Sequence, residues 1–146
     1  RTFITLGEKT GATPDGRGAG EEMSKNISPT MGMDVNGVTA LLNSVGRIDS
    51  LHFPGDYVLD LLLHPAAVAG PEGLDAMRTL LEVYMKRNGI GLQFNIFDAE
   101  TLVEAQQHPE RYRGLQIRVC GWNVLFNNLS RKEQDAYIRR ARNIGA

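Results

Sequence analysis

The sequence predicts an α/β domain that follows a long, irregular N-terminal segment. Residues 57–63, 92–97 and 115–119 are apolar or alternating runs of strand length. Helical patterns separate these runs, and strands that alternate with helices are typical of an α/β layout. The first fifty residues hold eight of the sixteen glycines, a density that favours ordered loops over helices.

The sequence therefore divides into two parts. Residues 1–50 are expected to form Gly-rich loops that lie against the rest of a larger protein, with a short helix over 38–45 that follows Asn36 as its N-cap. Residues 51–146 are expected to form the α/β part. No internal repeat or low-complexity tract interrupts either part.

The first strand and helix of the α/β part have clear boundaries. The Leu- and Val-rich run 57–63 predicts a buried strand that ends at His64-Pro65, because the residue before a proline disfavours helical backbone. A helix is expected to open at Pro71 and to stop at Gly89, with basic residues in its last turn. Its apolar positions recur at spacings of three and four residues: Leu74, Met77, Leu80, Leu81 and Tyr84.

The second half of this part repeats the pattern. After the alternating strand 92–97, Asp98 predicts the N-cap of a helix that runs to about Gln107. The third strand, 115–119, leads directly into Cys120-Gly121-Trp122. Ser130, with Glu133 three residues later, predicts a capping box for a final helix.

Composition and charge exclude several classes of protein. The 146 residues have globular proportions, no apolar run approaches the ~20 residues of a membrane helix, and no secretion signal is visible. The absence of an initiator Met suggests a fragment or a processed product. One cysteine, Cys120, makes neither an internal disulfide nor a multi-cysteine metal site, which favours a reducing, cytoplasmic compartment.

The charge is unevenly distributed although the formal total is −1. Residues 111–146 hold eight Lys/Arg and two Asp/Glu, whereas residues 1–110 hold eight and fifteen. We expect the basic end to dock on the acidic remainder of the protein. No aromatic residues interleave with the basic ones, so a nucleic-acid partner is disfavoured.

The residues alone do not single out a catalytic site. His52, His64 and His108 have no metal-ligand spacing and are interpreted as structural, and no metal site is predicted. The Gly-rich segment contains no phosphate-binding loop. Catalysis by a Ser/His/Asp or Cys/His arrangement stays open on spacing alone.

One segment changes this interpretation. Residues 118–122, Arg-Val-Cys-Gly-Trp, resemble the Arg-Val-x-Gly-aromatic signature of the glycyl radical enzymes. The resemblance extends over about residues 11–140. It includes the loop Gly-Ala-Thr-Pro-Asp-Gly-Arg at 11–17 and further matches at 19–20, 28–29, 32–40, 93–95, 105–106, 109–112 and 134–138. This ordered set is far more specific than the short signature.

The resemblance implies that Gly121 carries the radical, with Arg118, Val119, Cys120 and Trp122 supporting its loop. An α-carbon radical conjugates with the adjacent amide nitrogen and carbonyl, which requires a planar α-carbon that glycine reaches without a Cβ clash. Bulky Trp122 and the following apolar residues at 124–126 are expected to shield it. Cys120 is interpreted as a small buried residue, because neighbouring side chains on extended backbone point to opposite faces.

The same resemblance implies a larger enzyme of the pyruvate formate-lyase-like branch. Such an enzyme is a lyase or acyltransferase, dehydratase or decarboxylase that acts through a thiyl radical on a cysteine absent from this sequence. The fold implied is the C-terminal part of a barrel. No cofactor is expected to be bound; a radical S-adenosylmethionine activase with an iron–sulfur cluster would install the radical. The implied partners are the remainder of the catalytic chain, the activase and a second copy in a homodimer, with no nucleic acid or membrane.

Two alternatives stay open at this stage, and one related family is disfavoured. Cys-Gly pairs also occur in anaerobic ribonucleotide reductases, but those have a cysteine-ligated zinc site that one cysteine cannot build. A free-standing spare-part protein could dock on an oxygen-cleaved lyase and replace its lost C-terminus. A plain binding module would require that Gly121 never carries a radical. Trp122-Asn123 departs from the usual Tyr or Phe followed by a small residue, so the substrate stays open.

Overall fold

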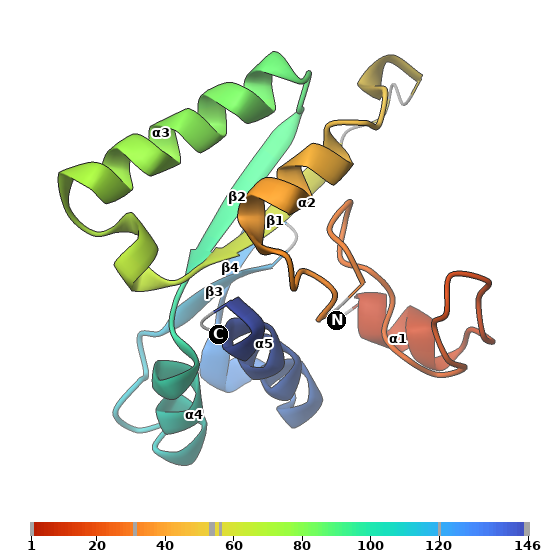
Figure 1. The fold of residues 1–146 in the computed structure, drawn as a ribbon. Helices are drawn as coiled ribbons and strands as arrows, with labels where there is room; N and C mark the ends of the chain where they lie inside the picture. The colour runs from red at the N-terminus through yellow and green to blue at the C-terminus, as the bar shows by residue number, and fades with distance from the viewer. Residues whose placement is uncertain (1, 31, 53–54, 56, 120, 145–146) are drawn as a thin grey trace.

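The computed structural model describes residues 2–30, 32–52, 55, 57–119 and 121–144 (Figure 1). Their helices are α1 (Thr2–Glu8), α2 (Gly37–Val45), α3 (Gly70–Lys86), α4 (Ala99–Gln107) and α5 (Arg131–Ile144). Their strands are β1 (Val58–Leu63), β2 (Gly91–Ile96), β3 (Gln116–Val119) and β4 (Trp122–Leu125). In these ranges, no helix combines the length and apolar character needed to cross a membrane.

The strands form two separate pairs. Strands β1 and β2 are parallel and are joined through α3, with Leu59 opposite Leu92 and Leu61 opposite Phe94. Strands β3 and β4 form an antiparallel hairpin. The mixed α/β character and the three predicted strands are confirmed. The prediction omitted β4, and it also omitted α1 within the segment expected to be loops.

Two hydrophobic clusters hold these elements together. One lies between β1, α2 and α3, and it is formed by Leu42, Val45, Leu59, Leu61 and Tyr84. The other joins α4, α5 and the hairpin, and its large members include Leu102, Ile117, Val119, Phe126, Leu129 and Tyr137. The second cluster packs against the hairpin that contains Gly121.

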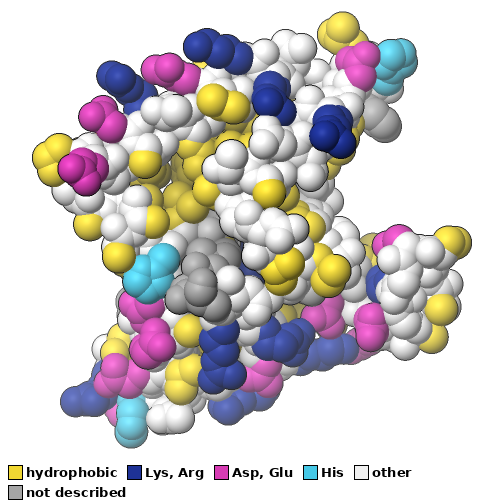
Figure 2. All heavy atoms as spheres, in the orientation of Figure 1, with side chains coloured by type: hydrophobic (Ala, Val, Ile, Leu, Met, Phe, Trp, Pro, Cys, Tyr) yellow, Lys and Arg dark blue, Asp and Glu magenta, His cyan; other side chains and the backbone are white. Residues whose placement is uncertain are grey.

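Helix α3 buries only part of its apolar stripe. Tyr84 is buried against β1, but Leu74 is 65% exposed and Leu81 is 38% exposed. An apolar cleft of about 430 Å³ lies between α2 and α3, and Met77 and Leu80 of α3 line it. Figure 2 shows hydrophobic side chains gathered in the hollow between these helices.

The predicted helix starts are largely confirmed. Asp98 accepts a hydrogen bond from the Thr101 amide at 2.6 Å. Ser130 and Glu133 form the predicted capping box, with the Ser130 amide donating to the Glu133 carboxylate at 2.7 Å. Asn36 is the N-cap residue of α2, as predicted, but its side chain forms no capping hydrogen bond.

The basic C-terminal helix docks on the acidic N-terminal segment, as the charge distribution predicts. Arg139 lies 2.7 Å from Glu22, and Lys132 lies 3.0 Å from Glu8. Figure 2 shows basic and acidic side chains interspersed over this part of the surface. The most buried contact joins Arg140 to Asp34 at 2.8 Å. The N-terminal segment thus contacts α5 of its own chain.

Arg17 organises the loop 11–21 from inside. Its guanidinium is buried and donates hydrogen bonds to the backbone carbonyls of Gly11, Gly18 and Glu21. A glycine at position 7 is required where α1 meets this loop, because a Cβ there would lie 2.1 Å from the Glu21 carbonyl oxygen. These contacts give the predicted loops a defined shape.

Candidate functional site

The hairpin between β3 and β4 carries the predicted radical position. Gly121 lies in the connection between these two strands, because the register pairs Val119 with Trp122. Gly121 has a φ of +96°, a conformation that side-chain-bearing L-residues rarely adopt. Cys120 falls outside the described residues, so its predicted burial stays a prediction.

Gly121 is exposed on its outer side. A Cβ built on it would find no heavy atom within 4 Å beyond its chain neighbours. The requirement for glycine therefore comes from its backbone conformation and not from crowding within the described residues. A second protein has room to approach this α-carbon.

The apolar residues predicted to shield Gly121 take different positions in this chain, and the shield itself stays a prediction. Trp122 is 66% exposed, because it lies at the hairpin tip, beyond the edge of the hydrophobic cluster. Phe126 is fully buried in that cluster, where it anchors the base of the hairpin. Val124 is only partly buried and packs on the same cluster. These apolar residues hold the hairpin in place and leave Gly121 open.

Strand β2 binds the backbone of the hairpin through two buried amide side chains. Residues two apart on a strand share a face, and Gln93 and Asn95 both point toward β3. The Asn95 Oδ1 accepts from the Arg118 amide at 2.8 Å, and its Nδ2 donates to the Arg118 carbonyl at 3.1 Å. The Gln93 Oε1 accepts from the Gly121 amide at 3.3 Å.

A buried ionic cluster lies behind β3. The Lys25 ammonium is 3.2 Å from the Asp60 carboxylate, and both side chains are almost fully buried. Lys25 also donates to the Arg118 carbonyl at 3.1 Å and lies 5.3 Å from the centre of the Tyr137 ring. Arg140 donates to the Asp60 backbone carbonyl at 2.7 Å. Lys25 therefore links the N-terminal segment to the strand that leads into Gly121.

Burial governs the electrostatics of this cluster. It raises the pKa of the Asp60 carboxyl above its ordinary value, while Lys25, Asn26 and Arg140 act in the opposite direction without cancelling the shift. Burial and the cationic neighbours thus act on the pKa of Asp60 in opposite directions, and the effect of burial is the larger.

The other predicted support residues take different positions. The Arg118 side chain is exposed and its Nη1 donates to Asn123 at 3.3 Å, whereas Val119 is buried beneath the hairpin. His52 and His108 lie at the surface, and His64 accepts a hydrogen bond from the Ala66 amide. Within the described ranges, no group of three or more His, Cys, Asp or Glu could hold a metal ion.

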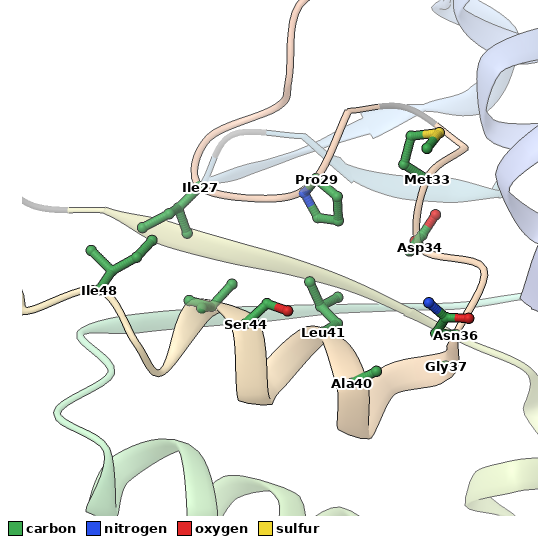
Figure 3. Close-up of a pocket in the computed structure, with 11 residues that line it drawn as sticks. Ile27, Pro29, Met33, Asp34, Asn36, Gly37, Ala40, Leu41, Ser44 and Ile48 are labelled. Carbon is green, nitrogen blue, oxygen red and sulfur yellow. The ribbon is translucent and has the colours of Figure 1, made fainter. Parts of the chain in front are cut away.

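A separate pocket of about 300 Å³ lies between α2 and the preceding loop (Figure 3). Ile27, Pro29 and Met33 form its loop side, and Leu41 and Ser44 belong to α2. None of its lining residues belongs to the hairpin or to β2. The pocket is therefore not part of the site at Gly121.

Sequence reasoning assigned no role to Gln93, Asn95 or Lys25. The alternation along residues 92–97 already places Gln93 and Asn95 on one face, and two amides on a buried strand indicate a polar partner. Lys25 has no comparable signal, because its partners Asp60 and Arg118 are distant in sequence.

Comparison with known proteins agrees with this geometry. The family model described as "Glycine radical" matches residues 23–127. The chain therefore belongs to the glycine radical family, and it corresponds to the C-terminal region of glycyl radical enzymes.

Its relatives include dehydratases and decarboxylases. It is 42% identical over 94% of its length to a trans-4-hydroxy-L-proline dehydratase of Clostridioides difficile, and 39% identical over 92% to an indoleacetate decarboxylase of Tractidigestivibacter scatoligenes. The glycerol-bound B12-independent glycerol dehydratase of Clostridium butyricum superimposes with a TM-score of 0.88 at 36% identity, over 95% of this chain. The chain spans only 17%, 15% and 18% of these three proteins, respectively.

Proposed function

We propose that Gly121 stores a protein radical and that this chain is the radical-storing domain of a larger enzyme. The observation that carries this proposal is the environment of Gly121. It is a positive-φ glycine between β3 and β4, open on its outer side and bonded through its amide to a neighbouring strand. The family match over residues 23–127, which include Gly121, supports the assignment.

The chemistry follows from the structure of a glycine residue. Removal of one hydrogen atom from Cα leaves one electron, which spreads onto the amide nitrogen and the carbonyl when the α-carbon is planar. A Cβ would oppose that planar geometry. The open space over Gly121 gives an activase access to the hydrogen. An activase of the radical S-adenosylmethionine class is the proposed partner for this step.

The exposure of Gly121 also requires a cover during catalysis. A carbon radical reacts with oxygen, and Trp122 beside it is itself 66% exposed in this chain. We propose that the remainder of the catalytic chain, built as a barrel, covers the hairpin after activation. Gly121 would then take a hydrogen atom from a cysteine thiol of that remainder, which leaves a thiyl radical to act on the substrate.

Dehydration or decarboxylation is the proposed class of reaction for the whole enzyme, which we expect to be a cytoplasmic homodimer. The relatives named above carry out these reactions, and this chain matches 15–18% of the length of each.

Electron paramagnetic resonance of the anaerobically activated enzyme tests the role of Gly121. We expect an organic radical whose signal is split by the single remaining α-hydrogen, and we expect Gly121→Ala to abolish it. Gly114→Ala is the matched control, because Gly114 also has open space around its Cβ position but lies outside the turn. A signal that survives Gly121→Ala would contradict the proposal.

A further inference from the structure

The buried side chain of Gln93 has a feature that the storage of a radical does not by itself require. Its Oε1 accepts the Gly121 amide hydrogen, so its Nε2 group must point elsewhere. That Nε2 is buried and has no hydrogen-bond partner among the described residues. The buried Gln93 side chain therefore has one observed hydrogen bond, which it accepts from the Gly121 amide.

The neighbouring Asn95 shows how differently a structural amide is used. Asn95 satisfies both its oxygen and its nitrogen on the backbone of Arg118, and so replaces a missing neighbouring strand. Arg118 is thus fixed in place without any help from Gln93. Gln93 reaches past this anchored position to the turn itself, where it contacts the backbone atom bonded to the Gly121 α-carbon.

The hydrogen bond from Gly121 to Gln93 bears on the electronic state of the α-carbon. When the amide nitrogen shares its lone pair with a radical on Cα, the nitrogen becomes electron-poor and its N–H becomes a stronger donor. A hydrogen bond to a more polarised donor is stronger than one to an ordinary amide. The bond is 3.3 Å in the closed-shell chain, which is long for N–H···O, and it can shorten when the radical forms.

We propose that Gln93 is a positioning residue that favours the radical form of Gly121 over its closed-shell form. Its carbonyl fixes the plane of the peptide before Gly121 and stabilises the electron-poor nitrogen of the radical. This inference rests on the proposed function, because it concerns the radical that Gly121 stores. Gln93 takes no part in hydrogen transfer itself.

Two substitutions separate this role from simple packing. Gln93→Leu keeps an apolar body of similar size but removes the acceptor. Gln93→Glu keeps an oxygen toward Gly121 and replaces the Nε2 group, which has no acceptor in the described residues, by a second carboxyl oxygen. Gln116→Leu is the matched control, because Gln116 is an exposed glutamine on β3 that bonds to the Asn123 side chain and not to Gly121.

The test uses the full-length enzyme, activated anaerobically, with spins counted per chain by electron paramagnetic resonance. The loss of one neutral hydrogen bond changes an equilibrium constant by about two- to tenfold, so we expect Gln93→Leu to lower the spin count by that factor. The spectrum of Gln93→Leu should also change, because the Gly121 amide nitrogen then carries a different share of the unpaired electron. Isotopically labelled glycine measures this share. Gln93→Glu and Gln116→Leu should keep the parental count.

Different failures have different meanings. A parental spin count and spectrum in Gln93→Leu would overturn the inference and leave the proposed function intact. An equal loss in Gln93→Leu and Gln93→Glu would also overturn it, because the acceptor would then not be the property that matters. The absence of any radical in the parent enzyme would instead contradict the proposed function.

Discussion

Replacement of Lys25 by Met tests whether the buried ionic cluster holds the N-terminal segment to the hairpin. Methionine fills a similar volume but carries no charge. It leaves the Asp60 carboxylate fully buried, with a hydrogen bond at 3.0 Å from Asn26 to Oδ2. The other oxygen, Oδ1, has no hydrogen-bond partner among the described residues. The Arg118 carbonyl keeps its bond from Asn95.

The expected loss is large because a single buried charge is left without its partner. Removal of one member of a buried ion pair typically destabilises a protein by about 3–5 kcal/mol. That amount is a substantial part of the total stability of a domain, which is about 5–15 kcal/mol. Replacement of both residues, as in Lys25→Met with Asp60→Leu, removes the uncompensated charge. We therefore expect the double variant to be more stable than Lys25→Met alone.

The pH dependence has a definite sign. Burial raises the pKa of Asp60 in the folded chain above its pKa in the unfolded chain. The free energy of unfolding therefore falls as the pH rises from the unfolded-state pKa through the folded-state pKa. Without Lys25, which opposes this shift, the folded pKa rises further. The loss of unfolding free energy in Lys25→Met should therefore be greatest near neutral pH, and it should become smaller in acid, where Asp60 takes up a proton.

Urea unfolding followed by circular dichroism, at neutral and at mildly acidic pH, measures these differences. Trp122 is the only tryptophan and is 66% exposed, so its fluorescence is a poor reporter of unfolding. A loss below about 1 kcal/mol at neutral pH would place the pair among weak, solvated ion pairs and refute the reasoning. A double variant as unstable as the sum of the two single variants would refute it as well.

Two further substitutions test the packing and the capping of the fold. Gly89→Ala would bring a Cβ within 2.3 Å of the buried Tyr84 ring, so we expect the free energy of unfolding in urea to fall by about 1–3 kcal/mol. Gly114→Ala places its Cβ in open space and should change that free energy little. Equal effects of the two substitutions would contradict this account. Asp98→Ala should cost about 1 kcal/mol. Hydrogen bonds from Thr101 lower the pKa of Asp98, so the stabilisation by its carboxylate is present above the unfolded pKa and is lost as the pH falls through the folded pKa. Asp98→Asn should retain the cap without this pH dependence, and an unchanged pH profile in Asp98→Asn would contradict the assignment.

Local signals in the sequence predicted much of the fold. The run 57–63, the Asp98 cap and the Ser130–Glu133 box each depend on neighbouring residues, and each corresponds to an observed element. Strand β4 was missed because only four residues pair, directly after a turn at Gly121. Helix α1 was missed because it belongs to a segment whose glycine content favours loops.

The candidate site was predictable only in part. The motif at 118–122 identified Gly121 through resemblance, and its positive φ agrees with the choice of glycine. The exposure of Trp122, which lies outside the hydrophobic cluster, was not predictable, because whether a side chain reaches a core depends on tertiary packing. The contacts of Gln93 and Lys25 join residues distant in sequence, which a pattern of spacing does not reveal.

The most direct test of the central claim is the position at which oxygen cuts the activated chain. Oxygen adds to an α-carbon radical and leads to scission of the backbone at that residue. The account predicts that air exposure of the activated enzyme releases a C-terminal piece that begins at about Trp122, which is 25 residues long in this sequence. Mass spectrometry measures the piece, and the Gly121→Ala variant should release none. Cleavage at another residue, or the same cleavage in Gly121→Ala, would contradict the assignment of the radical to Gly121.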